Sequence, residues 1–350
     1  MTTLPRAQVL APIYEQMPTG VSVTPDGRIF LCFPRWFDDV AFTVGELRDG
    51  KVHAYPDMET NSIDYSEAWR HFLSVQSIVA TGSTTLWVLD TGRPWFLPAR
   101  PGAMKLVEVD LQQNAPRRTF EIPYGIARLG TYLNDVRFDF TSGDEGTAFI
   151  TDSATLTPSA IIVIDLHTGK KLRRLEKSCS VQPSLPAPVI EGKPMRIRLR
   201  FGINFPYKAG VDGIAISPDG KTLYYCPLLS DRLYSVDTAL LADASASDDD
   251  VAKSITDLGV KGFSDGLECD EFGRVYATDL ERNRVRRRDR DGTWSTIAED
   301  ERMIWTDTLS IGADRNIYFT ANQLNRMAIF NSGRDLRRPP YFLFHAPIDK

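Results

Sequence analysis

The sequence predicts an all-β protein, a six-bladed β-propeller with a central channel, and three observations lead to this fold class. A unit of two alternating strands joined by a tight turn occurs six times in the 350 residues. Successive copies lie roughly 40–80 residues apart, close to the period of a propeller blade with several strands. Segments with helical spacing of apolar residues are scarce.

Each copy alternates apolar and polar residues, which is the period of a half-buried strand. Turns such as Asp26-Gly27 and Asp219-Gly220 supply the positive φ angles that tight hairpins require. In chain order the copies cover residues 20–31, 77–89, 134–150, 212–225, 265–277 and 307–319.

The wide gap between the third and fourth copies predicts an insertion around residues 178–210. Its composition is that of a loop, because it carries Pro183, Pro186, Pro188, Pro194 and Pro206. Within it, Met195–Phe201 alternates strictly and predicts an edge strand with its arginines on one face. We therefore predict one propeller domain over residues 1–350 with a Pro-rich insertion.

The two chain ends are predicted to pair and close the ring, because an open ring would expose strand edges. Gln8–Tyr14 and Tyr341–Ile348 are the candidate strands. The apolar residues of Asp64–Val75 fall at helical spacing and predict one helix, and Thr238–Ala244 predicts a shorter one.

Composition argues against several functional classes. The net charge of −5 disfavours a nucleic-acid partner, which normally requires a basic surface. No segment approaches the roughly 18 apolar residues of a membrane helix, and the first 18 residues lack the apolar core of a secretory signal.

Four distant cysteines favour reduced thiols and a cytoplasmic location. No phosphate-binding or dinucleotide fingerprint is present, so we expect a small-molecule ligand or substrate, no nucleotide cofactor and no membrane partner. The oligomeric state stays open.

Several motifs spread over nearly the whole chain resemble the major royal jelly protein/Yellow family, most closely its microbial, leaderless branch. They are Gly20–Trp36, Ser74–Gly92, Tyr132–Ala154, Gly210–Leu228, Trp305–Leu324 and Phe330–Phe344. The resemblance implies a six-bladed propeller. For function it implies several possibilities, since members include pigmentation proteins linked to dopachrome conversion, salivary binders of small amines, and nutritive proteins.

A more distant resemblance is to the SMP-30/gluconolactonase-like propellers, which hold a divalent cation, usually calcium, at the top of the channel. Asn134, Asp212 and Asp265 match three of their ligand positions in order, with Asp212 in place of an Asn. The first blade reads Met17-Pro18-Thr19-Gly20 and has no Glu, so one ligand of that set is missing. The resemblance implies calcium or another divalent cation on these three residues.

Carboxylates recur at one position of the repeat, where an inner strand begins at the channel mouth. Asp212, Asp265 and Asp307 open three copies, and Asn134-Asp135 opens a fourth. Converging carboxylates repel one another unless a cation neutralises them or their pKa values rise, as in a general acid/base pair. Alternatively, each Asp caps the backbone of its own turn.

The candidate catalytic residues are accordingly Asp135, Asp265 and Asp307, and the candidate metal ligands are Asn134, Asp212 and Asp265. Arg35, Trp36 and Trp95 follow strands of the first two copies, where exposed Arg and Trp favour flat or anionic ligands. With Asn134 they form the predicted ligand-binding set. No histidine or serine lies in a nucleophile motif.

Two functional classes remain open from the sequence. One is an enzyme acting at the channel mouth on a small cyclic metabolite, by lactonase-like hydrolysis or dopachrome-like tautomerisation. The other is a binding protein that holds a small aromatic or amine ligand without converting it, because propellers host many unrelated functions.

Overall fold

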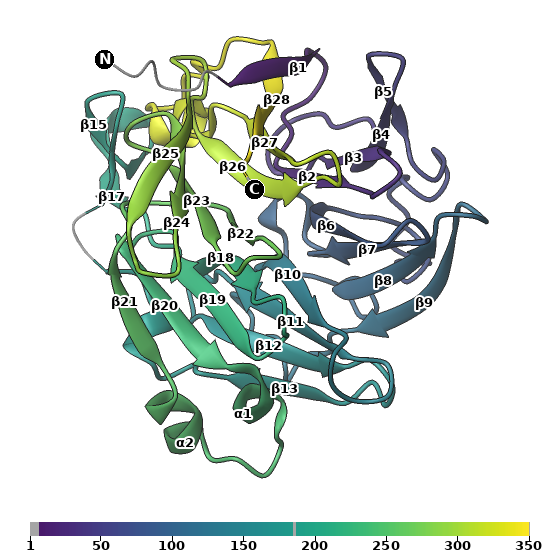
Figure 1. Cartoon of the computed structure of the whole chain (residues 1–350). Helices are drawn as coiled ribbons and strands as arrows, with labels where there is room; N and C mark the ends of the chain where they lie inside the picture. Colours follow the sequence, from purple (N-terminus) through teal and green to yellow (C-terminus); the bar gives the residue numbers. More distant parts are fainter. Residues whose placement is uncertain (1–6, 185–186, 350) are drawn as a thin grey trace.

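Six four-stranded antiparallel sheets surround a common centre in the computed structural model (Figure 1), so the predicted six-bladed β-propeller is confirmed. The structure describes residues 7–184 and 187–349, and Pro186 of the predicted insertion lies outside them.

The strands of each blade follow one another from the centre outward. Blade one consists of β2 (Gly20–Val23), β3 (Ile29–Cys32), β4 (Val44–Arg48) and β5 (Lys51–Ala54). Blade two consists of β6 (Val75–Thr81), β7 (Thr85–Asp90), β8 (Lys105–Asp110) and β9 (Ala115–Glu121). Blade three consists of β10 (Leu133–Asp139), β11 (Thr147–Asp152), β12 (Ala160–Asp165) and β13 (Lys171–Arg174). Blade four is β18 (Val211–Ile216), β19 (Thr222–Pro227), β20 (Arg232–Asp237) and β21 (Thr256–Val260); blade five is β22 (Leu267–Cys269), β23 (Val275–Asp279), β24 (Arg284–Arg288) and β25 (Trp294–Glu299).

Blade six combines both ends of the chain. Its inner strands are β26 (Thr306–Ile311) and β27 (Asn316–Ala321), followed by β28 (Tyr341–Pro347) and then β1 (Gln8–Ile13). Figure 1 shows the purple β1 beside the yellow β28, and their register pairs Gln8 with His345 and Ile13 with Tyr341. The predicted ring closure is therefore confirmed.

The inner strands approach one another closely, and glycines permit this contact. A Cβ atom on Gly213 would lie 2.2 Å from the carbonyl oxygen of Asp265, and one on Gly266 would lie 2.3 Å from that of Asp307. Any side chain at these positions would push neighbouring blades apart. Gly213 and Gly266, which follow Asp212 and Asp265, thus serve the packing of the ring.

Helices are few and short, and none among the described residues is long and apolar enough to cross a membrane. α1 (Thr238–Ala242) confirms the shorter predicted helix, and α2 (Asp248–Lys253) follows it. The helix predicted over Asp64–Val75 is absent, since that segment forms turns. The physical reason is that its amides have partners other than their i−4 carbonyls: Phe72 N donates to the Thr60 carbonyl, and Leu73 N and Ser74 N donate to Asp90. The buried Lys105 ammonium donates to the carbonyls of Ala68 and His71 at 2.9 and 2.8 Å.

The insertion between blades three and four forms two small hairpins. They are β14 (Val189–Ile190) with β15 (Lys193–Pro194), and β16 (Arg196–Arg198) with β17 (Asn204–Pro206), flanked by the 3-10 turns η2 (Cys179–Val181) and η3 (Arg200–Gly202). Part of the predicted edge strand is therefore present as β16. The insertion packs on blade six's loop, which carries η4 (Leu324–Arg326) and η5 (Ala328–Phe330); the remaining 3-10 turn is η1 (Pro94–Phe96).

Candidate functional site in the propeller channel

The candidate site lies where the inner strands begin, and irregular pairing shapes it. The register of β6, β10, β18 and β26 with their neighbours shifts at residue 76, at 134–135, at 212–213 and at 307–308. Such bulges free a residue from the ladder and redirect its side chain. The same local irregularity thus occurs in four blades, and in three of them it falls on residues that the sequence repeat singled out.

Asp212 and Asp265 are the central pair of the site. Both are buried, with side chains belonging to residues only 4% and 8% exposed. Burial and the nearby charges of Asp265 and Asp307 raise the pKa of Asp212 well above its ordinary value, so Asp212 keeps its proton and donates it in a hydrogen bond to Asp265. Two carboxyl groups therefore share one proton.

Asp265 is the more readily ionised member of this pair. Burial raises its pKa to about 6, while hydrogen bonds from Asp212 and from the indole of Trp305 counteract that rise. The Trp305 Nε1 lies 2.6 Å from Asp265 Oδ2. A carboxyl group that titrates close to neutral pH can exchange protons in both directions.

Asp307 and Asp135 complete the cluster in different ways. Burial and the charge of Asp265 raise the pKa of Asp307 well above its ordinary value, although Asn322 donates a 2.7 Å hydrogen bond to it. Asp135 has a cationic partner instead, since Arg137 Nη1 lies 2.9 Å from its Oδ1. Ser77 donates to the same oxygen at 2.6 Å. Asp135 is thus a paired charge beside unpaired carboxyl groups.

Aromatic side chains cover the carboxyl groups on the side of the insertion. Tyr207 of the insertion lies near enough that the charges of Asp212, Asp265 and Asp307, together with burial, raise its pKa. Its ring packs against Phe330 with centroids 5.3 Å apart. The insertion therefore places a phenol near the acidic cluster.

A second part of this cover comes from blades one to three. The indole of Trp36 donates to the Tyr132 hydroxyl at 2.5 Å, and that hydroxyl donates to Gln76 Oε1 at 2.7 Å. Phe96 stacks near both rings, with centroids 6.1 Å from Trp36 and 5.6 Å from Tyr132. Trp36 and Tyr132 belong to the apolar cluster that also contains Trp305 and Phe330.

The predicted ligand-binding residues lie in contrasting environments. Trp36 belongs to the cover, and Trp95 is 42% exposed with its backbone amide 2.6 Å from the Arg35 carbonyl. The Arg35 guanidinium is buried and donates to four backbone carbonyls, on Val40, Phe72, Leu73 and Asn61. Asn134 donates to Ser153 Oγ at 2.9 Å. A ligand-binding role for these four residues stays a prediction.

The predicted metal ligands Asn134, Asp212 and Asp265 contact protein groups in this arrangement. Within residues 7–184 and 187–349, no three His, Cys, Asp or Glu side chains are placed to hold a cation together. The amide of Asn134 is directed to Ser153, and Asp212 and Asp265 are held together by a shared proton. In this arrangement proton sharing relieves the repulsion between these carboxyl groups. A metal-binding role for Asn134, Asp212 and Asp265 stays a prediction.

Beyond the cluster the channel continues as a cavity of about 280 Å³ lined by the farther parts of the inner strands. Arg137 and Glu268 both line it, and Arg137 also donates to the Leu267 carbonyl at 2.9 Å. Burial raises the pKa of Glu268. Arg137 thus separates the carboxyl cluster from this cavity and contacts both.

Sequence reasoning missed Gln76, Tyr132, Tyr207 and Trp305. Gln76 could have been found, because it occupies the repeat position that Asp212 and Asp307 occupy in later blades. Tyr207 gave no comparable signal, since the repeat does not extend into the insertion.

Solved structures of other propellers resemble this fold. Regucalcin from Agrobacterium tumefaciens, described as a calcium-binding protein, matches with a TM-score of 0.57 and 17% identity over 99% of this chain and 96% of its own. A gluconolactonase from Xanthomonas campestris matches with a TM-score of 0.56 and 14% identity over 99% and 95%. A luciferin-regenerating enzyme matches with a TM-score of 0.59 and 13% identity over 98% and 95%. At such low identity these likenesses show the fold alone.

Sequence relatives give a more specific result. Major royal jelly protein 3 of Apis mellifera is 29% identical over 65% of this chain and 38% of its own length. Protein yellow of Drosophila melanogaster is 25% identical over 67% of this chain and 43% of its own length, so the match spans under half of either relative. The family model for major royal jelly proteins matches residues 73–338, which is most of the chain. The chain therefore belongs to the major royal jelly protein family.

Proposed function

We propose that this protein is an enzyme that transfers protons to and from a small cyclic metabolite at the channel carboxyl groups. The observation that carries this proposal is the buried pair in which Asp212 holds a proton next to an Asp265 whose pKa is about 6. Neighbouring carboxyl groups whose pKa values are driven apart provide an acid and a base in one place. The fold likeness to a gluconolactonase is consistent with such a reaction.

The pair supplies what either candidate reaction needs. In lactone hydrolysis, Asp265 takes a proton from water as its oxygen attacks the carbonyl carbon, and Asp212 gives its proton to the ring oxygen as the C–O bond breaks. In a tautomerisation, Asp265 takes a proton from carbon and Asp212 protonates the carbonyl oxygen. Asp307 adjoins the pair, and Asp135 with Arg137 fixes the local charge.

Access to the carboxyl groups requires the cover to shift. Asp212, Asp265 and Asp307 are 4%, 8% and 5% exposed, so a substrate reaches them only when the aromatic side chains above them move aside. Tyr207 is the natural moving group, because its residue lies in the insertion and is itself only half-buried. A closed site of this kind excludes bulk water once the substrate is bound, and for lactone hydrolysis it retains the one water that reacts.

A second candidate function is binding without turnover, and the aromatic cover favours it. Rings of Trp36, Tyr132 and Tyr207 next to ionisable carboxyl groups suit an aromatic amine, because a ring face and a carboxylate both attract an ammonium group. This function needs the same residues but no proton transfer.

The experiment measures turnover and binding on the same variants. A six-membered sugar lactone and an indole quinone serve as substrates, and tryptamine serves as the amine probe. Asp265→Asn should lower turnover by on the order of 10²–10⁴-fold, because an amide cannot accept a proton. Asp144→Asn, at a carboxylate that is 82% exposed, is the matched control and should retain full activity.

Saturable binding of tryptamine with no turnover of either substrate would instead support the binding protein. Turnover that survives in Asp265→Asn would show that the reaction takes place elsewhere. The cytoplasmic location stays a prediction beside this function.

A further inference from the structure

We propose that a second pocket, between the insertion and the loop of blade six, binds a small organic anion with at least two negative charges, such as a phosphate ester or a polycarboxylate. Its volume is about 540 Å³, which suits a small metabolite. It is lined by β14, β15, Met195 and Arg198 on one side, and by η4, Asn331 and residues 335–338 on the other. Neither the channel carboxyl groups nor the residues that cover them line this pocket.

The charge of the lining is the first reason for an anionic ligand. Five cations line the pocket, and only two acidic residues oppose them: the cations are Lys193, Arg198, Arg326, Arg337 and Arg338, and the acids are Glu191 and Asp335. The whole chain carries a net charge of −5. A concentration of positive charge in a concave site of an acidic protein raises the local concentration of anions.

Two of the five cations are already neutralised by carboxylates. Arg326 makes two hydrogen bonds to Glu191, at 2.9 and 2.6 Å. Arg337 is held by Asp38 at 2.7 and 2.6 Å and also by Asp335. These pairs build the walls of the pocket and hold the loop of blade six in place.

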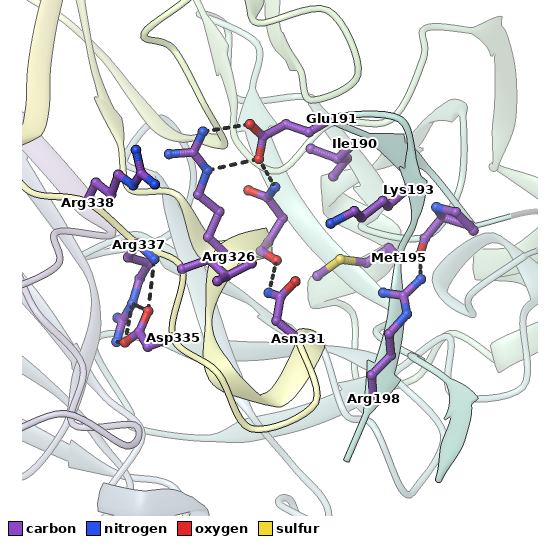
Figure 2. A pocket seen from close by; sticks show the side chains of 13 residues that line it. Ile190, Glu191, Lys193, Met195, Arg198, Arg326, Asn331, Asp335, Arg337 and Arg338 are labelled. Carbon is purple, nitrogen blue, oxygen red and sulfur yellow. Dashed lines mark hydrogen bonds and ion pairs between the residues drawn. The ribbon is translucent and has the colours of Figure 1, made fainter. Parts of the chain in front are cut away.

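The other three cations form no ion pair with a carboxylate among the described residues. Arg198 donates to the carbonyls of Phe330 and Pro194, which leaves its positive charge uncompensated. The side chains of Lys193 and Arg338 are exposed and make no hydrogen bond or ion pair within the part of the chain that the structure describes. Figure 2 shows these two side chains on opposite sides of the pocket, with Arg326 between them.

The positions of the unpaired cations indicate the number of charges on the ligand. Lys193 and Arg198 come from the insertion, whereas Arg338 comes from the segment that leads into β28. A single anionic group can pair with the cations on only one side of the pocket, so a ligand with two separated anionic groups fits best. Apolar contacts from Ile190, Met195 and Leu336 leave room for a carbon skeleton between them. Binding would join two segments that lie next to the channel cover.

The test uses citrate and pyrophosphate as probes and calorimetry as the measurement. Both should bind saturably at low salt and raise the melting temperature, because a ligand stabilises the state that binds it. The variant Lys193→Gln/Arg338→Gln should weaken binding by roughly tenfold or more for each lost charge. The tighter probe then identifies carboxylate or phosphate as the preferred group.

The control variant Lys51→Gln/Arg290→Gln removes two exposed cations outside the pocket and should bind like the wild type. This comparison separates a specific site from a general effect of net charge. Circular dichroism verifies that both variants fold. Failure of both probes to bind, or equal affinity in the two double variants, would overturn the proposal. Because the channel residues are untouched, neither result depends on the proton-transfer activity.

Discussion

Two sets of buried aspartates differ in the partners that surround them. One set lies at the start of the inner strands and consists of Asp212, Asp265 and Asp307. The other ends the second strand of three blades and consists of Asp90, Asp152 and Asp279, which are all 0% exposed. Each set repeats around the ring, and burial alone does not distinguish them.

The second-strand aspartates each have a cation. Asp90 accepts from Lys105 Nζ at 2.9 Å and from the amides of Leu73 and Ser74. Asp152 is paired with Arg173 at 2.7 Å, and Asp279 with Arg284 at 2.8 Å. These carboxylates fix the chain where it enters the inner strand or turns between strands, and their role is structural.

The interaction partners of the inner aspartates are neutral hydrogen-bond donors and the other inner aspartates. Trp305 and Asn322 donate to Asp265 and Asp307, and Asp212 supplies its own proton. Carboxyl groups without a cation cost folding free energy at neutral pH, and such a cost marks a candidate functional site. The difference between the sets lies in the neighbouring charge.

The largest effect on stability is expected from breaking a paired carboxylate. Lys105→Met leaves Asp90 charged and buried without a cation, so the free energy of unfolding should fall by about 3–5 kcal/mol. Urea denaturation measures this. Lys253→Met, which breaks the exposed pair with Asp250, is the control and should change stability by less than about 1 kcal/mol. Equal effects of the two substitutions would contradict the structural role of Asp90.

At the inner aspartates the opposite effect on the free energy of unfolding is expected. Asp212→Asn keeps a donor to Asp265 but removes an ionisable group, so it should stabilise the protein at neutral pH while lowering activity. The free energy of unfolding should rise by on the order of 1–3 kcal/mol, since a tenfold change in an acid dissociation constant corresponds to about 1.4 kcal/mol. A loss of stability in this variant would show that Asp212 is a structural residue like Asp90.

The pH dependence sharpens the same contrast. The pKa of Asp265 is raised in the folded state from 3.8 to about 6, so the folded protein binds more protons than the unfolded chain between those values. This contribution to stability is present below about pH 4 and is lost as the pH rises through 6. The pKa of Asp212 is also raised well above its ordinary value, so the wild type loses further stability through Asp212 as the pH rises, and Asp212→Asn does not. The advantage of Asp212→Asn over the wild type should therefore grow between about pH 5 and pH 8. A constant difference would argue against proton sharing.

Among these changes, added calcium should have the smallest effect on stability. A cation can bind between Asn134, Asp212 and Asp265 only after the shared proton leaves and the Asn134–Ser153 hydrogen bond breaks. We expect the same melting temperature with calcium and with chelator. A rise with calcium that disappears in Asp265→Ala would support a divalent cation as cofactor and contradict this expectation.

The sequence by itself determined the ring and the repeat position of its acidic residues. Strand alternation and Asp-Gly turns are local properties, so six copies and the pairing of the two chain ends could be predicted without the structure. The position of Asp212, Asp265 and Asp307 at the start of inner strands follows from the same repeat. Their equal burial and mutual proximity are consequences of ring symmetry.

Only the tertiary structure decided which of these residues interact and what covers them. Asn134 and Asp135 both lie in the bulge of β10, and their side chains have different partners: Asp135 forms an ion pair with Arg137, and Asn134 donates a hydrogen bond to Ser153. The segment Asp64–Val75 is not a helix, because amides at its end donate to Thr60 and to the buried Asp90 instead of to their i−4 carbonyls. The cover by Tyr207 and the cationic pocket depend on an insertion packing against a loop that is distant in the sequence. Such contacts depend on non-local packing and charge, which no local pattern in the sequence records.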